Sequence, residues 1–206
     1  ILALAPDLIL SSSDANPVSA IQQIRNAGTN MLLIKEQESL EGANNKLAVI
    51  GKALNAEEKA NELIATNNTL FAKADSIKST LNTSPKVMFV LAVNGTSNFM
   101  IAGKNTGAAK MIELAGGENA FNSYSGYKPT SIESIIAANA DYVLVMQSRI
   151  DEISTGLKNT PGINSISAVT NNKIIGMDGN YLLGFGPRFG SAILSLMQKI
   201  HPNLNI

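Results

Sequence analysis

The sequence predicts an α/β protein built from two lobes joined by a single long rigid helix, with the first lobe incomplete. Short apolar segments alternate with helical segments in both halves of the chain, a pattern typical of α/β folds. Residues 1–10 recur at an offset of 134 as residues 135–144, and the same offset places Gly28 on Gly162. Between the two copies, residues 56–84 contain neither glycine nor proline, which favours one uninterrupted helix.

Each copy of the repeat reads as a helix end, a Pro-Asp or Ala-Asp turn, an apolar strand, a polar loop, a helix and a glycine. In the first copy, Pro17 at a helix start and Gly28 past its end fit the usual asymmetry of helix termini, and the α/β alternation favours a parallel sheet. Residues 128–134 lead into the second copy and have no counterpart before Ile1, so we expect the first lobe to be short by about one strand and one helix. Its predicted elements are a strand at 7–10, a loop at 11–16, a helix at 17–27 and a strand at 31–34.

A helix is predicted over about 39–54, and a long amphipathic helix follows from 56 to about 81. Its apolar stripe consists of Ala60, Leu63, Ile64, Asn67, Leu70, Phe71, Ala74, Ile77 and Leu81. About 26 residues at 1.5 Å each would span about 39 Å, more than the diameter of a small domain. We interpret this helix as a stiff connector, the alternative being a long surface helix of one domain. The expected boundaries are 1–55 for the partial first lobe, 56–84 for the connector and 85–206 for the second lobe.

A complete α/β series is predicted after Pro85, with an irregular stretch from Gly116 to Thr130. Its strands are expected at 87–93, 99–102, 142–146 and 173–177. Its helices are expected at about 106–115, 131–138, 152–157 and 188–200.

The charge balance argues against nucleic acid as a partner. Sixteen basic and sixteen acidic residues cancel, so no strong field steers the chain toward nucleic acid or anionic lipid. No run approaches about 18 apolar residues, the length that a membrane-spanning helix needs. The absence of cysteine excludes disulfides, thiolate chemistry and zinc-thiolate sites.

The residues needed for catalysis are sparse, and we expect no enzymatic activity. The single histidine, His201, precedes Pro202 near the end of the chain, where we expect it to terminate a helix at the surface. Two acidic pairs, 57–58 and 151–152, fall at predicted helix starts, where the helix dipole favours carboxylates. The loops are poor in the His, Asp and Glu side chains that a metal site requires.

The strongest local signal is the turn 184–190, Gly-Phe-Gly-Pro-Arg-Phe-Gly, which leads into an apolar helix. A dinucleotide-binding fingerprint would need glycine where Phe189 stands. Arg188 falls in the first helical turn, where the helix dipole disfavours a positive charge unless an anionic partner or ligand pairs with it. A ligand carboxylate could be bound there by the guanidinium and by free helix N–H groups, the alternative being that Arg188 folds onto an acidic neighbour. If this turn instead bound a nucleotide or a phosphorylated substrate, the protein would be an α/β enzyme, which we keep as the alternative to a binding protein.

Three segments, 128–145, 102–107 with 114–121, and Gly184 to Arg188, together resemble a known family in their order and spacing. They are similar to the periplasmic substrate-binding proteins of ABC importers that carry haem, cobalamin and iron-siderophores. The resemblance covers essentially the whole chain. The combination of 126–129, Gly-Tyr-Lys-Pro, with Gly-Phe-Gly-Pro-Arg looks most like the haem-binding branch.

The resemblance implies a class III periplasmic-binding-protein-like fold with the ligand in the cleft between two lobes. It implies a periplasmic or other extracytoplasmic monomer that captures haem and delivers it to the permease of an ABC importer. Haem would then be the transported ligand and not a catalytic cofactor, and the protein would meet the membrane only through the permease. A cobalamin- or ferric-siderophore-binding protein of the same family is the alternative.

The resemblance also implies roles for individual residues. Arg188 matches the arginine that haem binders place near the haem or its propionates, and Glu133 matches a glutamate that docks onto the permease. A solvated helix-start glutamate is the alternative for Glu133, whose repeat mate would lie just before Ile1. The expected ligand-binding residues are Arg188, Gly186, Tyr127, Asn94, Ser12 and Ser13. An axial tyrosine is expected upstream of Ile1, and no metal ligand is expected within the chain.

Overall fold

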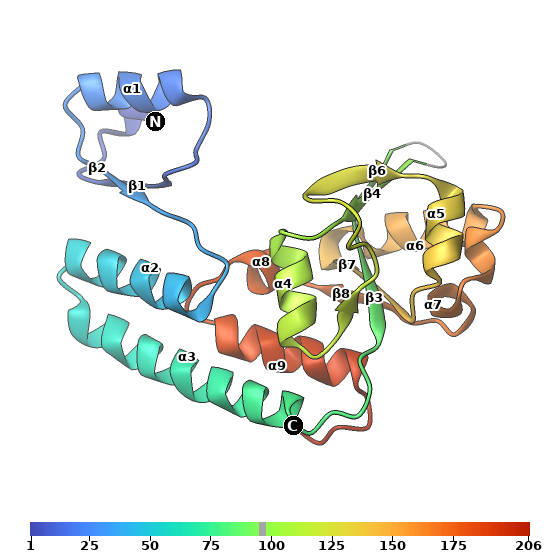
Figure 1. Ribbon diagram of the computed structural model, residues 1–206. Helices are drawn as coiled ribbons and strands as arrows, with labels where there is room; N and C mark the ends of the chain where they lie inside the picture. Colours follow the sequence, from blue (N-terminus) through green and yellow to red (C-terminus); the bar gives the residue numbers. More distant parts are fainter. Residues whose placement is uncertain (95–97) are drawn as a thin grey trace.

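The computed structural model describes residues 1–94 and 98–206 and has the predicted α/β class (Figure 1). A two-stranded parallel sheet with one helix forms the N-terminal part, and a six-stranded mixed sheet carries the rest of the strands. In Figure 1 the N-terminal part stands apart from the large sheet, with three long helices along the base of the molecule. The described residues include no helix long and apolar enough to cross a membrane.

The first sheet pairs β1 (Ile9–Ser12) with β2 (Met31–Ile34), in register from Ile9 opposite Met31 to Ser12 opposite Ile34. The short helix η1 (Leu2–Leu4) precedes it, and α1 (Val18–Asn26) connects the two strands. The strand predicted at 7–10 lies two residues later. Asp7 remains in the preceding turn, where its carbonyl accepts a hydrogen bond from the Asn30 side chain, and the ladder begins at Ile9.

The backbone confirms the internal repeat. Ala5 and Asn139, which are 134 residues apart, both adopt the left-handed conformation, with φ of 44° and 42°. Gly28 and Gly162 do the same, with φ of 77° and 85°, a region that glycine enters without steric cost. In each copy, therefore, the backbone is left-handed at the same two positions: where the first helical segment ends before the strand, and where the next helix ends.

Two antiparallel helices follow the first sheet, α2 (Leu40–Ala53) and α3 (Glu57–Lys78). The Ser39 side chain caps α2 by accepting a hydrogen bond from the Gly42 N–H. The long helix ends at Lys78, three residues earlier than predicted, and its 22 residues span about 33 Å. Its buried positions, Ala60, Asn67 and Ala74, recur every seven residues and form one face. Helix α3 packs against α2 and against α9 (Phe189–Ile200).

The large sheet has the strand order β6-β4-β3-β7-β8, and β5 pairs with the start of β3. Its strands are β3 (Lys86–Asn94), β4 (Asn98–Ala102), β5 (Glu118–Asn119), β6 (Tyr127–Thr130), β7 (Tyr142–Met146) and β8 (Ile174–Met177). Strands β5, β7 and β8 lie on parallel ladders, whereas β4 runs antiparallel to β3 and β6. The stretch predicted as irregular up to Thr130 thus contains β5 and β6. Strand β6 escapes recognition because it is a short, exposed edge strand that includes Pro129.

Both faces of the large sheet are covered by helices, so strand β3 is apolar on both sides. Val87 and Phe89 belong to a core shared with α4, α8 and α9, while Met88 and Val90 belong to a second core under α5, α6 and α7. The helices are α4 (Gly107–Leu114), α5 (Ile132–Ala138), α6 (Ile150–Asn159), α7 (Ser167–Thr170), α8 (Gly179–Leu183) and α9 (Phe189–Ile200), with short turns η2 (Gln147–Arg149) and η3 (Ile163–Ser165). Ala43 of α2 and Ala74 of α3 also join the first core, which fixes both long helices to the large sheet.

His201 ends α9 as predicted, but the expectation that it lies at the surface is wrong. His201 is only 8% exposed, and its imidazole lies close to Gly116, where an added Cβ would stand 3.2 Å from Nε2. Burial lowers the pKa of His201, opposed by nearby backbone groups of Gly116 and Ala115.

Candidate functional site

The turn between α8 and α9 is held by aromatic packing. Asp178 caps α8 by accepting a hydrogen bond of 2.8 Å from the Tyr181 N–H. Phe185 then adopts a positive φ of 39° and buries its ring 5.0 Å from that of Phe189. The ring of Phe185 also abuts Gly107 at the start of α4. The exposed residues of the turn are therefore carried on a buried aromatic anchor.

Polar contacts from both long helices reach the same turn. The buried Asn67 of α3 donates from Nδ2 to the Gly186 carbonyl at 3.0 Å, and its Oδ1 accepts from the Gly190 N–H at 3.3 Å. Lys46 of α2 donates to the Gly184 carbonyl at 3.1 Å and forms an ion pair with Glu36, in the loop that follows β2. The turn is thus fastened to elements more than one hundred residues away in the sequence.

Arg188 is exposed at the N-cap of α9, with its guanidinium 5.1 Å from the centroid of the Tyr181 ring. None of the ion pairs formed by the described residues includes Arg188, so the alternative of an acidic neighbour is wrong. Burial raises the pKa of the Tyr181 phenol, and the positive charge of Arg188 opposes this. Stacking on an aromatic face orders the guanidinium and leaves its edge free to bind carboxylate or phosphate oxygens.

The expectation of free N–H groups at the start of α9 is not met at the first two positions. The Phe189 N–H donates to the Gly186 carbonyl at 3.1 Å, and the Gly190 N–H is bonded to Asn67. A hollow of about 110 Å³ lies around the turn and is lined by Tyr181, Gly186 and Arg188 among others. An anionic ligand at this site would consequently be bound by the Arg188 guanidinium and not by the first two N–H groups of α9.

Ser12 and Asn94 are the last residues of β1 and β3, and Arg188 lies in the segment that follows β8 and α8. In open α/β sheets, ligands bind at the edge formed by the carboxyl ends of the strands. The Ser12 hydroxyl accepts a hydrogen bond of 3.1 Å from the Asp14 N–H, and the exposed Ser13 hydroxyl lies 3.3 Å from the Asp14 carboxylate. Asn94 ends β3, but its side chain and the following residues 95–97 lie outside the described part of the chain.

Tyr127 lies at the start of β6, where its ring packs edge-on against Phe89 with a centroid distance of 6.3 Å. Burial raises the pKa of its phenol, and the negative charge of Glu38 raises it further. Hydrogen bonds with the Ala108 backbone and the Thr106 side chain lower the pKa of the phenol. The phenol therefore faces the start of α4, which Phe185 of the Arg188 turn also contacts through Gly107.

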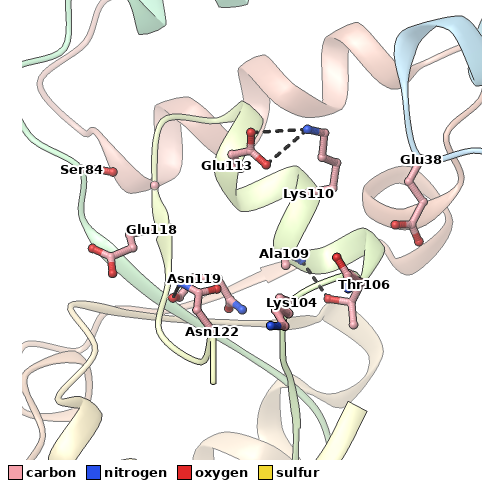
Figure 2. Close-up of a pocket in the computed structure, with 12 residues that line it drawn as sticks. Glu38, Ser84, Lys104, Thr106, Ala109, Lys110, Glu113, Glu118, Asn119 and Asn122 are labelled. Carbon is pink, nitrogen blue, oxygen red and sulfur yellow. Dashed lines mark hydrogen bonds and ion pairs between the residues drawn. The ribbon is translucent and has the colours of Figure 1, made fainter. Parts of the chain in front are cut away.

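Sequence reasoning missed Glu38, which precedes the cap of α2 and lies against the first residue of α4. Burial raises the pKa of its carboxyl group, and a hydrogen bond from the Gly107 N–H lowers it. Glu38 rims a pocket of about 580 Å³ that runs along α4 to Glu118 (Figure 2). Lys110 and Glu113 form an ion pair of 3.2 Å in this pocket. None of the predicted ligand-binding residues lines it.

Glu133 lies in the first turn of α5 and is exposed to solvent. The Ser131 side chain caps this helix through the Ser134 N–H. Ile136, one turn further on, is 38% exposed, so this face of α5 presents both a carboxylate and an apolar side chain. Among the described residues, no group of three or more His, Asp or Glu side chains converges in a way that could hold a metal ion.

An α/β protein with two sheets, a long helix that follows the first sheet in the sequence, and an exposed arginine that forms no ion pair among the described residues has features typical of α/β ligand-binding proteins. Comparison with known families agrees. Residues 1–181 match the periplasmic binding protein family, and the chain belongs to that family.

Two solved structures are similar along almost the whole chain. Periplasmic heme-binding protein BhuT in complex with two hemes is 30% identical with a TM-score of 0.89, covering 97% of this chain and 76% of that one. Periplasmic heme-binding protein RhuT from Roseiflexus sp. RS-1 in apo form is 31% identical with a TM-score of 0.90, covering 98% of this chain and 78% of that one.

Curated relatives are more distant. The uncharacterized ABC transporter substrate-binding lipoprotein YvrC of Bacillus subtilis is 22% identical over 205 residues, which are 98% of this chain and 64% of that protein. A cobalamin-binding protein of Halobacterium salinarum is 24% identical over 208 residues, which are 98% of this chain and 55% of that protein. The chain thus spans between about half and two thirds of the length of these relatives.

Proposed function

We propose that this protein is an extracytoplasmic substrate-binding protein that captures haem between its two lobes and delivers it to an ABC importer. The proposal rests on the guanidinium of Arg188, which is exposed after the carboxyl end of β8 and forms no ion pair among the described residues. The identity of 30–31% to two proteins named as periplasmic heme-binding proteins supports haem as the ligand. Haem is here the cargo, and no residue of the chain is assigned as its axial ligand.

The chemistry of haem suits this turn. Haem carries two propionate carboxylates on a flat apolar ring, and an arginine fork pairs with a carboxylate through two parallel hydrogen bonds. Gly186, two residues before Arg188, has open space beside it, since an added Cβ would meet only the Gly184 carbonyl at 3.7 Å. A flat ligand can therefore approach the backbone there. Ser12, Ser13 and Asn94 are proposed to line the opposite and adjoining rims, and Tyr127 a more distant part of the site.

Titration with hemin, followed at the Soret band, tests this function. Replacing Arg188 by alanine removes a charge-assisted hydrogen bond of about 1.5–3 kcal/mol, so the affinity should fall about 10- to 100-fold. Arg25→Ala is the matched control, because Arg25 is an exposed arginine at the far end of α1. No spectral change on adding hemin, or equal affinity of the Arg188→Ala variant and the parent, would rule out the haem proposal.

Cobalamin is the second candidate ligand, because the Halobacterium salinarum relative is named a cobalamin-binding protein. A cobalamin ligand presents amides where haem presents carboxylates, so its affinity should depend little on Arg188. Competition among hemin, cyanocobalamin and a ferric siderophore separates the candidates. A thermal-shift assay with a panel of nucleotides tests the enzyme alternative, since a bound ligand at 100 times its Kd stabilises a protein by about 2.7 kcal/mol.

Glu133 is proposed to dock onto the permease of the importer. Its exposed carboxylate in the first turn of α5 lies beside the partly exposed Ile136, a combination that suits a transient protein contact. Glu133→Ala should leave hemin affinity unchanged and reduce ligand-dependent transport, because a rim charge acts mainly on association. Glu58→Ala, an exposed first-turn glutamate of α3, is the matched control. An unchanged transport rate in the Glu133 variant would contradict the docking role.

A further inference from the structure

Asn67 is a fully buried polar residue in the middle of the apolar face of α3. Burying an amide is costly unless its donor and its acceptor are both paired. Both partners of Asn67 are backbone groups of the α8–α9 turn, the Gly186 carbonyl and the Gly190 N–H. One side chain thus closes a bridge over the segment 186–190, at whose centre Arg188 stands.

Tight packing leaves this bridge little freedom. A Cβ on Gly190 would lie 2.6 Å from the Cβ of Leu70 and 3.1 Å from the carbonyl oxygen of Asn67, so α9 begins almost in contact with the backbone of α3. The rings of Phe71 and Phe189 add a contact with a centroid distance of 6.1 Å. Contacts with the long helix α3 therefore fix the position of the turn, in addition to its connection through α8 to β8.

We propose that Asn67 is a positioning residue for Arg188. It fixes the backbone two residues before and two residues after the arginine, whereas the Tyr181 ring orders only the guanidinium. The long helix consequently determines where the cation stands, although the Asn67 side chain is itself fully buried. The effect on ligand affinity rests on the proposed function, while the effect on the Arg188 geometry does not.

A double-mutant cycle with hemin tests the coupling. Asn67→Leu removes both hydrogen bonds at similar volume and should weaken hemin binding about tenfold when Arg188 is present, a coupling within the usual range for residues that share one network. In the Arg188→Ala background the same change should weaken binding by less than about twofold. The neighbouring Asn68→Leu variant is the matched control, because Asn68 is exposed and accepts a hydrogen bond from Asn44 of α2. Equal losses in both backgrounds, or an equal loss from Asn68→Leu, would overturn the proposal.

A second readout needs no ligand. In the NMR spectrum, Asn67→Leu should shift the Arg188 guanidinium resonance and raise the Tyr181 pKa toward its value in Arg188→Ala, because the cation that lowers it has moved. Asn67→Ser introduces no charge at this buried position and is too short to reach both Gly186 and Gly190, so it provides a second test if the leucine variant does not fold. If hemin does not bind the parent, the proposed function fails while these spectra still decide the role of Asn67. Unchanged Arg188 and Tyr181 signals in both Asn67 variants would refute it.

Discussion

Replacing Gly190 by alanine is a sharp test of the packing between α3 and α9. The added methyl group would lie 2.6 Å from the Cβ of Leu70, 3.1 Å from the Asn67 carbonyl and 3.2 Å from the Phe71 nitrogen. Two of these three atoms are backbone atoms and the third is a Cβ, so none can move without displacing a helix. The methyl group can be accommodated only if α9 moves away from α3.

The cost can be worked out from two opposing effects. Overpacking of a well-packed interior costs about 1–3 kcal/mol, whereas alanine gains at most about 1 kcal/mol over glycine from helix propensity. Gly190 is the second residue of α9, where helix propensity counts for less than in a helix interior, so the net loss should be about 1–2 kcal/mol. For a chain of this size, 1 kcal/mol corresponds to about 2–4 °C in Tm, so the Tm should fall by about 2–8 °C.

Thermal and urea unfolding followed by circular dichroism measures this change, and Gly156→Ala in α6 provides the control. A Cβ at Gly156 would meet Val93 at 3.5 Å, an ordinary contact, so the gain in helix propensity should raise the Tm by about 2–4 °C. The two glycine-to-alanine changes should thus have opposite signs. A Gly190→Ala variant at least as stable as the parent would refute the close approach of the two helices.

Three further predictions concern a titrating group, a helix cap and the ligand face. Because burial lowers the pKa of His201, the neutral side chain contributes stability above about pH 6.5. This stability is lost as the pH falls through the lowered pKa, with a slope of up to about 1.4 kcal/mol per pH unit. His201→Gln should flatten this part of the stability profile, and an unchanged slope would exclude His201 as its source. Thr106→Val should cost about 1–2 kcal/mol in urea unfolding, because the buried Thr106 hydroxyl caps α4 and also donates to the Gly103 carbonyl at 2.9 Å; full stability of the variant would argue against the cap. Gly186→Ala should leave the Tm within about 1 °C of the parent, since open space surrounds the added methyl group, yet it should weaken hemin binding; unaltered affinity would show that the ligand does not approach this backbone.

The elements that could be predicted are those with a strong local pattern. Strand β7 was predicted at its observed bounds, 142–146, because five consecutive apolar residues suit a strand buried on both faces. The long helix was predicted from its stripe, and only its last turn was overestimated. Strand β6 was not predicted, since its pairing with β4 depends on a tertiary contact and its residues are mostly exposed. Helix α8 was missed because it has only five residues and starts at Gly179.

The site was predictable only in part, for a similar reason. Arg188 was identified because a cation at a helix start conflicts with the helix dipole. Its stacking on Tyr181 and the use of two helix N–H groups within the protein depend on three-dimensional geometry that the local sequence does not encode. Asn67, 119 residues before Gly186, left one trace, namely an amide within an apolar stripe. Such a polar residue in a buried position is a signal of a hydrogen-bonded partner elsewhere in the fold.

NMR of the isotope-labelled protein titrated with gallium protoporphyrin, a diamagnetic analogue of haem, tests most directly whether the ligand binds at the Arg188 turn. We expect saturable shifts of the Gly186 backbone and the Arg188 guanidinium, with a smaller response from Ser12 and Ser13. These shifts should require about 10- to 100-fold more ligand in the Arg188→Lys or Arg188→Ala variants. Shifts confined to the pocket of Figure 2, or no saturable shifts at Arg188, would contradict haem binding at this site.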